Sequence, residues 1–143
     1  MEDYKLKRFL DAQQNSYETA VAEVQAGRKQ SHWMWYIFPQ IQGLGSSEMS
    51  QRYAIRDLEE ANLYLAEPLL GIRLISLCNE LLKLSNLTAT EIFGYPDNMK
   101  LRSSMTLFAQ VGGEDSVFEL VLRKYYGGVK DAATLQILSE LSS

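Results

Sequence analysis

The residues best suited to chemistry gather in one segment, Ser31 to Gly45, which reads SHWMWYIFPQIQGLG. This aromatic segment holds the only histidine of the chain, His32, and both tryptophans, Trp33 and Trp35. Histidine is the side chain whose unperturbed pKa lies near neutrality, so His32 is the candidate general acid or base. Rings packed this densely are costly to expose, so we expect them to form core, line a pocket or meet a partner.

Two features of the aromatic segment fit a binding site. Trp33 and Trp35 offer flat walls on which a planar ligand ring can stack. Pro39 ends a helix that begins at the tryptophans, so we expect the Gln40 amide, which donates and accepts hydrogen bonds, at a rim. A structural role fits the same residues: the rings as core, and His32 bonded to backbone at the start of an aromatic helix. The sequence leaves both interpretations open.

A second group of residues follows at Lys100 to Thr106, which reads KLRSSMT. Ser103, Ser104 and Thr106 place three hydroxyls within four residues, and such side chains are poor helix formers unless something uses them. Beside Lys100 and Arg102 they could form a cradle for an anion or a phosphate near a helix start. Close packing between helices is the alternative use of small hydroxyl residues.

These groups predict one cleft, between the aromatic segment and the Lys100–Thr106 helix. It would bind a nucleotide-derived or other phosphorylated small molecule, with His32 as catalytic residue. The candidate ligand-binding residues are Trp33, Trp35, Gln40, Tyr53, Lys100, Arg102, Ser103 and Ser104. The alternative is a non-enzymatic regulatory or protein-interaction module, with the aromatic segment as core or docking surface. An exposed aromatic rim would equally fit a dimer contact, so the oligomeric state stays open.

No metal or cofactor is expected. One histidine, one cysteine and no cluster of carboxylates provide no set of metal ligands. No phosphate-binding Walker loop, nucleophile elbow or dinucleotide glycine fingerprint can be found either. Whether the protein is an enzyme therefore stays open at the level of sequence.

Composition places the chain among ordinary single domains. Its 143 residues, 46% hydrophobic and 22% charged, are enough for one core, so residues 1–143 are predicted to form one domain. A net charge of −4 opposes binding to a phosphate backbone, so no nucleic-acid partner is expected.

The lone cysteine, Cys78, is predicted to be a small buried hydrophobic residue of a protein in a reducing compartment. The longest run of large apolar residues, Trp33 to Phe38, is far short of the roughly 20 residues of a membrane span. With no signal peptide visible, we expect a soluble, cytoplasmic protein without a membrane partner.

Helical spacing of apolar residues from Tyr4 onward predicts an all-α domain of about seven or eight short to medium helices. A helix that Pro68 opens is so widely apolar that we expect neighbours on most of its sides. Thr88 and Glu91 have the spacing of a capping box, and Gly94 is placed to end that short helix. Asp131 is a suitable N-cap for the last helix.

Several of these runs together resemble one known family. They are SHWMWYIFPQIQGLG, RYAI, EEANLYLAEPLLGIRL, IFGYPDNMKLRSSMTLF and YYGGVKDAATLQIL, and the resemblance as a whole extends from about Tyr4 to Leu138. They resemble the domain-of-unknown-function family 1810, sometimes mislabelled calpastatin, although that inhibitor is disordered and this composition is typical of a packed globule. The resemblance implies a small all-helical domain with no established activity. The order of elements is also similar to that of helical domains that act on ADP-ribose-like derivatives of NAD, a fold-level analogy.

Overall fold

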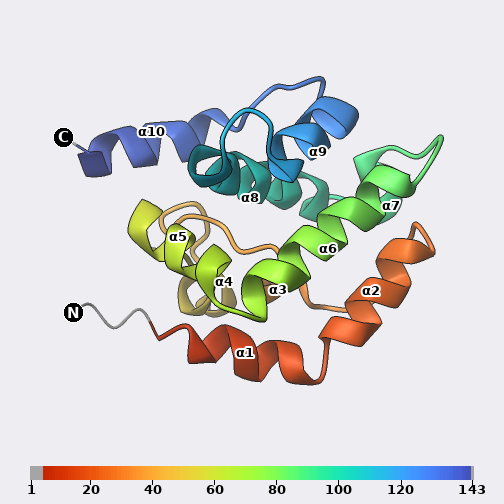
Figure 1. The fold of residues 1–143 in the computed structure, drawn as a ribbon, viewed down its shortest axis with the longest axis horizontal. Coiled ribbons are helices and arrows are strands. Elements are labelled where there is room, and N and C mark those ends of the chain that lie inside the picture. Colours follow the sequence, from red (N-terminus) through yellow and green to blue (C-terminus); the bar gives the residue numbers. More distant parts are fainter. Residues whose placement is uncertain (1–4, 143) are drawn as a thin grey trace.

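The structure is a computed structural model that describes residues 5–142 (Figure 1). The predicted helix start at Tyr4 and both ends of the predicted domain, residues 1–4 and 143, lie outside this part. Within it the chain forms ten α-helices and no strand. The helices are α1 (Lys7–Gln14), α2 (Tyr17–Gln25), α3 (Met34–Ile37), α4 (Glu48–Arg52), α5 (Leu58–Ala66), α6 (Leu70–Lys83), α7 (Ala89–Phe93), α8 (Asp97–Gly112), α9 (Val117–Tyr126) and α10 (Ala132–Ser142).

The all-α single domain predicted from the sequence is confirmed. Seven helices have eight residues or more, and α3, α4 and α7 are shorter, which gives ten helices where about seven or eight were expected. Of these, α7 has the predicted cap. The Thr88 hydroxyl accepts from the Glu91 N–H at 3.0 Å, and the Glu91 carboxylate accepts from the Thr88 N–H at 2.8 Å. Gly94 ends the helix with φ 74°, a conformation that favours glycine.

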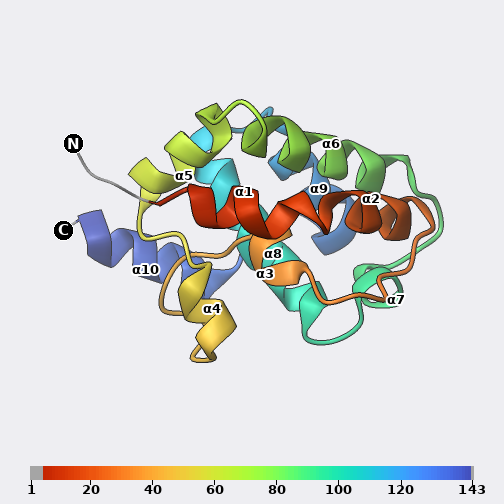
Figure 2. The ribbon, with the colours of Figure 1, turned by 90° about the horizontal axis from the view of Figure 1, so that it is seen from below.

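Two long helices, α6 and α8, organise the packing. α8 contacts α5, α7, α9 and α10, whereas α6 contacts α2, α5 and α9. In Figure 1, α1 and α2 lie along the lower edge, α9 and α10 along the upper edge, and α6 runs between them. Figure 2 shows α4 projecting at the lower edge, away from α6.

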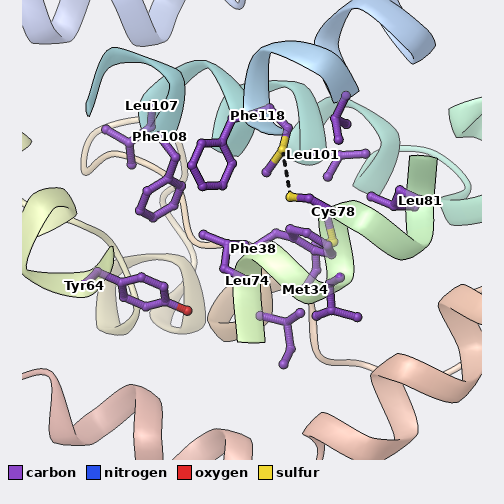
Figure 3. Packing of buried hydrophobic residues seen from close by; sticks show 14 of the residues in the cluster. Met34, Phe38, Tyr64, Leu74, Cys78, Leu81, Leu101, Leu107, Phe108 and Phe118 are labelled. Atoms are coloured by element: carbon purple, nitrogen blue, oxygen red, sulfur yellow. Dashed lines mark hydrogen bonds between the residues drawn. The ribbon is translucent and has the colours of Figure 1, made fainter. Parts of the chain in front are cut away.

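The core forms where α6 and α8 face the aromatic segment. Figure 3 shows Leu74, Cys78 and Leu81 of α6 gathered with Phe108 of α8 and Phe38 of the aromatic segment. Cys78 is fully buried, as predicted, and its thiol lies 3.6 Å from the sulfur of Met105. Because burial disfavours the thiolate, the pKa of Cys78 is raised above its usual range.

α6 differs from its prediction in two ways. It begins at Leu70 instead of at Pro68, which lies in the turn before the helix. The expectation of neighbours on most sides is wrong, because Ile72 is 67% exposed and Ile75 is also exposed. Their helix face points to solvent because the packing partners of α6 all lie on its other side.

α3 is the only helix of the aromatic segment, and the rest of the segment consists of bends, turns and irregular chain. Residues 40–55, which include the end of the segment, form a loop that closes on itself. The Gln42 N–H donates to the Ile55 carbonyl, and the Ile55 N–H donates to the Gln40 carbonyl, both at 2.8 Å. The side chains of Ile41 and Ile55 are buried beneath this closure. The loop therefore holds α4 at its tip and Gln40 at its base.

No single helix among residues 5–142 is long and apolar enough to cross a membrane. α5 and α6 taken together pass that test by length and composition alone, but they are bent by 88° at the break between them.

Candidate functional site

A hollow of about 230 Å³ lies between the start of α8 and the 40–55 loop. We call it the α8 hollow. Its walls come from this loop, from the first turns of α8 and from the start of α10. Its polar lining side chains include Gln40, Ser50, Lys100, Ser103 and Asp131. Gln40, Lys100 and Ser103, which sequence patterns singled out in two distant segments, therefore meet at one hollow.

The first turns of α8 are fixed by a local hydrogen-bond network. Asn98 donates from Nδ2 to the Thr90 hydroxyl at 2.9 Å and accepts the Met99 N–H at 2.9 Å. Residues four apart share one face of a helix, so Met99 and Ser103 both line the hollow. The Ser103 hydroxyl donates to the Met99 carbonyl at 3.2 Å, and such a hydroxyl can rotate toward a ligand.

Lys100 connects α8 with the aromatic segment. Its Nζ lies 5.4 Å from the centre of the Trp35 ring and 3.6 Å from Asp97 Oδ1. The other oxygen of Asp97 lies 2.8 Å from the ammonium group of Lys29. The carboxylate of Asp97 therefore pairs with the ammonium groups of Lys29 and Lys100. Together these three side chains carry one net positive charge beside the hollow.

Asp131 and Thr106 join α10 to α8. Asp131 caps α10 by accepting the N–H and the hydroxyl of Thr134, at 2.9 Å and 2.7 Å. Its own N–H donates to the Thr106 hydroxyl at 2.9 Å, and that hydroxyl donates to the Arg102 carbonyl at 2.8 Å. Asp131 Oδ1 has a more distant partner, the guanidinium of Arg102 at 3.9 Å. This oxygen is consequently the acceptor that Asp131 can offer to a ligand.

Comparison with known proteins places the chain in a family. A family model described as a protein of unknown function, DUF1810, matches residues 3–138. The chain belongs to the DUF1810 family. It is similar to the crystal structure of the conserved hypothetical protein Rv1873 from Mycobacterium tuberculosis. The identity is 46%, the TM-score is 0.94, and the match covers 96% of this chain and 99% of that chain. No curated protein matches the sequence.

The two tryptophans of this DUF1810 chain have different surroundings. Trp33 is 1% exposed, packs with Phe38 and Phe93, and donates from its indole to the Glu23 carboxylate at 2.9 Å. Trp35 is half-buried and lies under Lys100. The aromatic segment therefore contributes Trp33 to the core and Trp35 to the neighbourhood of the α8 hollow. Its buried rings leave little surface for docking a partner.

Glu23 holds the start of the aromatic segment in place. Partial burial acts to raise the pKa of Glu23, but hydrogen bonds from the Ser31 hydroxyl, the Gln30 and Ser31 N–H groups and the Trp33 indole outweigh it. These bonds stabilise the carboxylate, so the pKa of Glu23 falls from 4.5 to about 2.

His32 lies away from the α8 hollow. It is exposed and lines a separate hollow of about 230 Å³ together with Ser16, Thr19 and Ser31. None of the described side chains that line this hollow is a carboxylate or a cation that could act with the imidazole. Of the predicted ligand-binding residues only Trp33 lines this hollow, so His32 does not meet Gln40, Lys100 and Ser103 at the α8 hollow.

Tyr53, Arg102 and Ser104 also lie outside the lining of the α8 hollow. The Tyr53 ring packs against Phe9 and Tyr36, with centroids 6.0 Å and 5.3 Å apart. Arg102 turns toward Asp131, and its buried Nε has no hydrogen-bond partner among the described residues. Ser104 is fully buried and its hydroxyl likewise lacks a partner there. Ser103 is thus the only one of the two consecutive serines that reaches the hollow.

Sequence reasoning missed several residues of the site. Asp131 was recognised only as a helix cap, and Asp97 and Lys29 carried no signal because their pairing depends on the approach of the α2–α3 connection to the start of α8. Ser50 belongs to a short helix that periodicity does not reveal. Within residues 5–142, no three His, Cys, Asp or Glu side chains cluster in a way that could hold a metal ion.

Proposed function

We propose that this DUF1810 protein binds a small phosphorylated molecule, of the size of a sugar phosphate, in the α8 hollow. The observation that carries the proposal is the convergence of Gln40, Lys100 and Ser103 from two distant segments on one concave site. Concave sites with a few convergent polar groups are the usual form of small-molecule sites.

The charges of the site favour an anion of low charge. Lys29 and Lys100 share the single carboxylate of Asp97, which leaves one positive charge beside the hollow. An ammonium group that already touches a ring and a carboxylate is held in place, so binding a phosphate there costs little side-chain entropy. A phosphate oxygen at Lys100 would also lie within the reach of the Ser103 hydroxyl, which lines the same wall.

The side chains that the 40–55 loop and the start of α10 contribute suit hydroxyl groups. Asp131 offers a carboxylate oxygen, and Gln40 offers an amide that both donates and accepts. A carboxylate, an amide and a lysine around one hollow match the two kinds of group in a sugar phosphate, which are hydroxyls and phosphate. We assign the phosphate to Lys100 and Ser103, and the hydroxyls to Asp131 and Gln40.

The volume of the hollow limits the size of the ligand. Sites for drug-sized ligands usually measure roughly 300–1,000 Å³. About 230 Å³ therefore favours a single sugar phosphate over a whole dinucleotide. A larger nucleotide-derived ligand would have to leave its base outside the hollow.

Thermal unfolding with a panel of ligands tests this proposal. The panel contains ribose 5-phosphate, AMP, ADP-ribose, NAD and inorganic phosphate, each at millimolar concentration. A ligand at a hundred times its Kd stabilises the folded state by about 2.7 kcal/mol, a readily measured rise in Tm. We expect the rise with ribose 5-phosphate in the natural chain and its loss in Lys100→Met. No rise with any member of the panel would contradict the proposal.

A further inference from the structure

The hollow that His32 lines combines several polar side chains with no ion pair. It lies between the start of α2 and the first residues of the aromatic segment, and its volume is about 230 Å³. We call it the His32 hollow. Its polar lining residues include Asn15, Ser16, Thr19, Ser31 and His32. Since no carboxylate, ammonium or guanidinium group lines it within residues 5–142, the His32 hollow offers hydrogen bonds without a fixed opposing charge.

Three of these side chains have hydrogen-bonding groups that the fold does not use. In the part of the chain that the structure describes, the Asn15 amide, the Thr19 hydroxyl and the His32 imidazole have no hydrogen-bond partner. An amide, a hydroxyl and a neutral imidazole can each both donate and accept. All three side chains are exposed, so water satisfies them until a ligand replaces it.

The backbone that presents His32 is held on both sides. The Glu23 carboxylate accepts from the Ser31 N–H at 2.9 Å and from the Ser31 hydroxyl at 2.6 Å. It also accepts from the Trp33 indole at 2.9 Å. The Tyr36 hydroxyl donates to the His32 carbonyl at 3.4 Å. These bonds fix the neighbours and the carbonyl of His32, so a ligand that binds there pays little for ordering the backbone.

Two further hydroxyls lie along the same hollow. Ser16 is the N-cap residue of α2, but its hydroxyl makes no cap bond and instead pairs with the Tyr36 hydroxyl at 2.8 Å. A hydroxyl oxygen has two lone pairs, so one hydrogen bond leaves it able to accept another. Ser16 and Tyr36 therefore add acceptors for a ligand hydroxyl beside the three unused groups.

We propose that the His32 hollow binds one neutral sugar or polyol of monosaccharide size. Each hydroxyl of such a ligand both donates and accepts, as the amide, hydroxyl and imidazole groups of the hollow do. A phosphate or a carboxylate only accepts and an ammonium only donates, and no opposite charge lines the hollow to hold either. The volume lies below the roughly 300–1,000 Å³ of sites for drug-sized ligands, which favours a single ring over a chain of sugars.

This inference is independent of the ligand proposed for the α8 hollow. Among the described residues, none lines both hollows. The α8 hollow has Lys100 and Asp131 in its lining, whereas the His32 hollow has no such charges. The two proposals can therefore fail separately.

Proton NMR of the full chain, titrated with D-glucose, D-galactose or myo-inositol at millimolar concentration and one buffered pH, tests the inference. His32 is the only histidine, so its imidazole resonances are identified without ambiguity. The two indole N–H resonances separate the hollows, because Trp33 lines the His32 hollow and Trp35 lies under Lys100. Trp35→Phe assigns them. We expect saturable shifts of the His32 and Trp33 resonances with at least one of the three probes, and no shift of the Trp35 resonance.

A double variant measures the contribution of the unused groups. Asn15→Ala/Thr19→Val removes one amide and one hydroxyl and keeps His32 as the reporter. Two hydrogen bonds to the ligand are lost, so we expect about tenfold weaker binding of the same probe. The matched control, Asn79→Ala/Ser139→Ala, removes an amide and a hydroxyl at exposed positions of α6 and α10 and should bind as the natural chain does.

Three results would overturn the inference. One is the absence of any shift of the His32 resonances with all three probes. Another is equal affinity of the natural chain and Asn15→Ala/Thr19→Val, with circular dichroism showing that both are folded. The third is tighter binding of inorganic phosphate or of maltotriose than of the three probes, which would assign the His32 hollow to an anion or to a glycan chain.

Discussion

The α8 hollow differs from the hollow between α1 and the 40–55 loop, which Lys5, Arg8 and Arg52 line and which we call the basic hollow. At the α8 hollow, Lys100 is fixed between a ring and a shared carboxylate, and Asp131 adds a negative charge next to the start of α10. At the basic hollow, Arg8 is fixed by the buried Glu60 carboxylate and by backbone carbonyls. Fixed charges of both signs at the α8 hollow favour a particular small ligand, whereas the hydrogen bonds of Arg8 join segments of the fold.

The difference also shows which residues are structural and which are available. Arg8 stabilises the wall of the basic hollow and Thr106 stabilises the wall of the α8 hollow, whereas Lys100 lines the α8 hollow. Variants of Arg8 and Thr106 should therefore change stability, and variants of Lys100 should change binding.

The largest effect is expected at the support of the basic hollow. Arg8→Met removes the guanidinium that donates to the carbonyls of Lys5, Arg52 and Ala54, and it leaves the buried Glu60 carboxylate with only the more distant guanidinium of Arg56, at 3.9 Å. Removing one member of a buried pair costs about 3–5 kcal/mol of unfolding free energy. Urea unfolding measures this loss. The double variant Arg8→Met/Glu60→Gln should recover part of the lost stability, because it also removes the buried negative charge of Glu60. A loss below about 1 kcal/mol would refute the role we give to Arg8.

A smaller effect is expected at the support of the α8 hollow. Thr106→Val leaves the Asp131 N–H without its buried acceptor, at a cost of about 1–2 kcal/mol. Thr106→Ser keeps the hydroxyl and serves as the control. We expect Thr106→Val to weaken ribose 5-phosphate binding, because Asp131 shifts. Unchanged binding of ribose 5-phosphate in this variant would contradict the role we give to Asp131.

The support of the aromatic segment should depend on pH. The pKa of Glu23 is lowered from 4.5 to about 2, so its contribution to stability is complete above about pH 4.5 and is lost as the pH falls toward 2. Allowing for its partial exposure, Glu23→Gln should cost about 1–2 kcal/mol at pH 7. The difference between the natural chain and this variant, followed by tryptophan fluorescence during unfolding, should shrink between pH 4.5 and 2. A difference that stays constant over this range would mean that the carboxylate charge plays no part.

The smallest effect is expected at Ser104. Its buried hydroxyl has no partner among the described residues, so Ser104→Ala removes an unsatisfied polar group and should be neutral or stabilising by up to about 1 kcal/mol. Ribose 5-phosphate binding should be unchanged in Ser104→Ala and weaker in Ser103→Ala. Weaker binding of ribose 5-phosphate in Ser104→Ala would mean that Ser104 contributes to the ligand site.

Sequence patterns predicted the helices better than the site. Periodicity and caps such as Thr88 and Asp131 identify helices because their signals lie within a few residues of one another. The same local signals grouped Arg102, Ser103 and Ser104, although adjacent helix positions face different neighbours, and only Ser103 reached the hollow. The wide apolar surface of α6 predicted burial on most sides, but Ile72 remained exposed because nothing packs there.

Contacts between distant segments could not be predicted from the sequence. Lys5 and Arg52 come together only because Arg8 bonds to the backbone of both, and no spacing in the sequence encodes those bonds. We predicted one site for His32 and Lys100 because each lies beside residues that are typical of ligand binding. The fold places them at different hollows: His32 precedes the single turn of α3 and lines a hollow with Thr19 of α2, whereas Lys100 of α8 lines a hollow with Gln40.

The central claim is that Lys100 binds the phosphate of a sugar phosphate in the α8 hollow. Calorimetric titration with ribose 5-phosphate tests it most directly, using the natural chain, Lys100→Met and the control Lys83→Met. Methionine keeps an apolar chain against Trp35, so Lys100→Met removes the charge with little loss of packing. We predict binding to the natural chain and to Lys83→Met, and affinity at least tenfold lower for Lys100→Met. Equal affinity in all three proteins, or no binding to the natural chain, would contradict the claim.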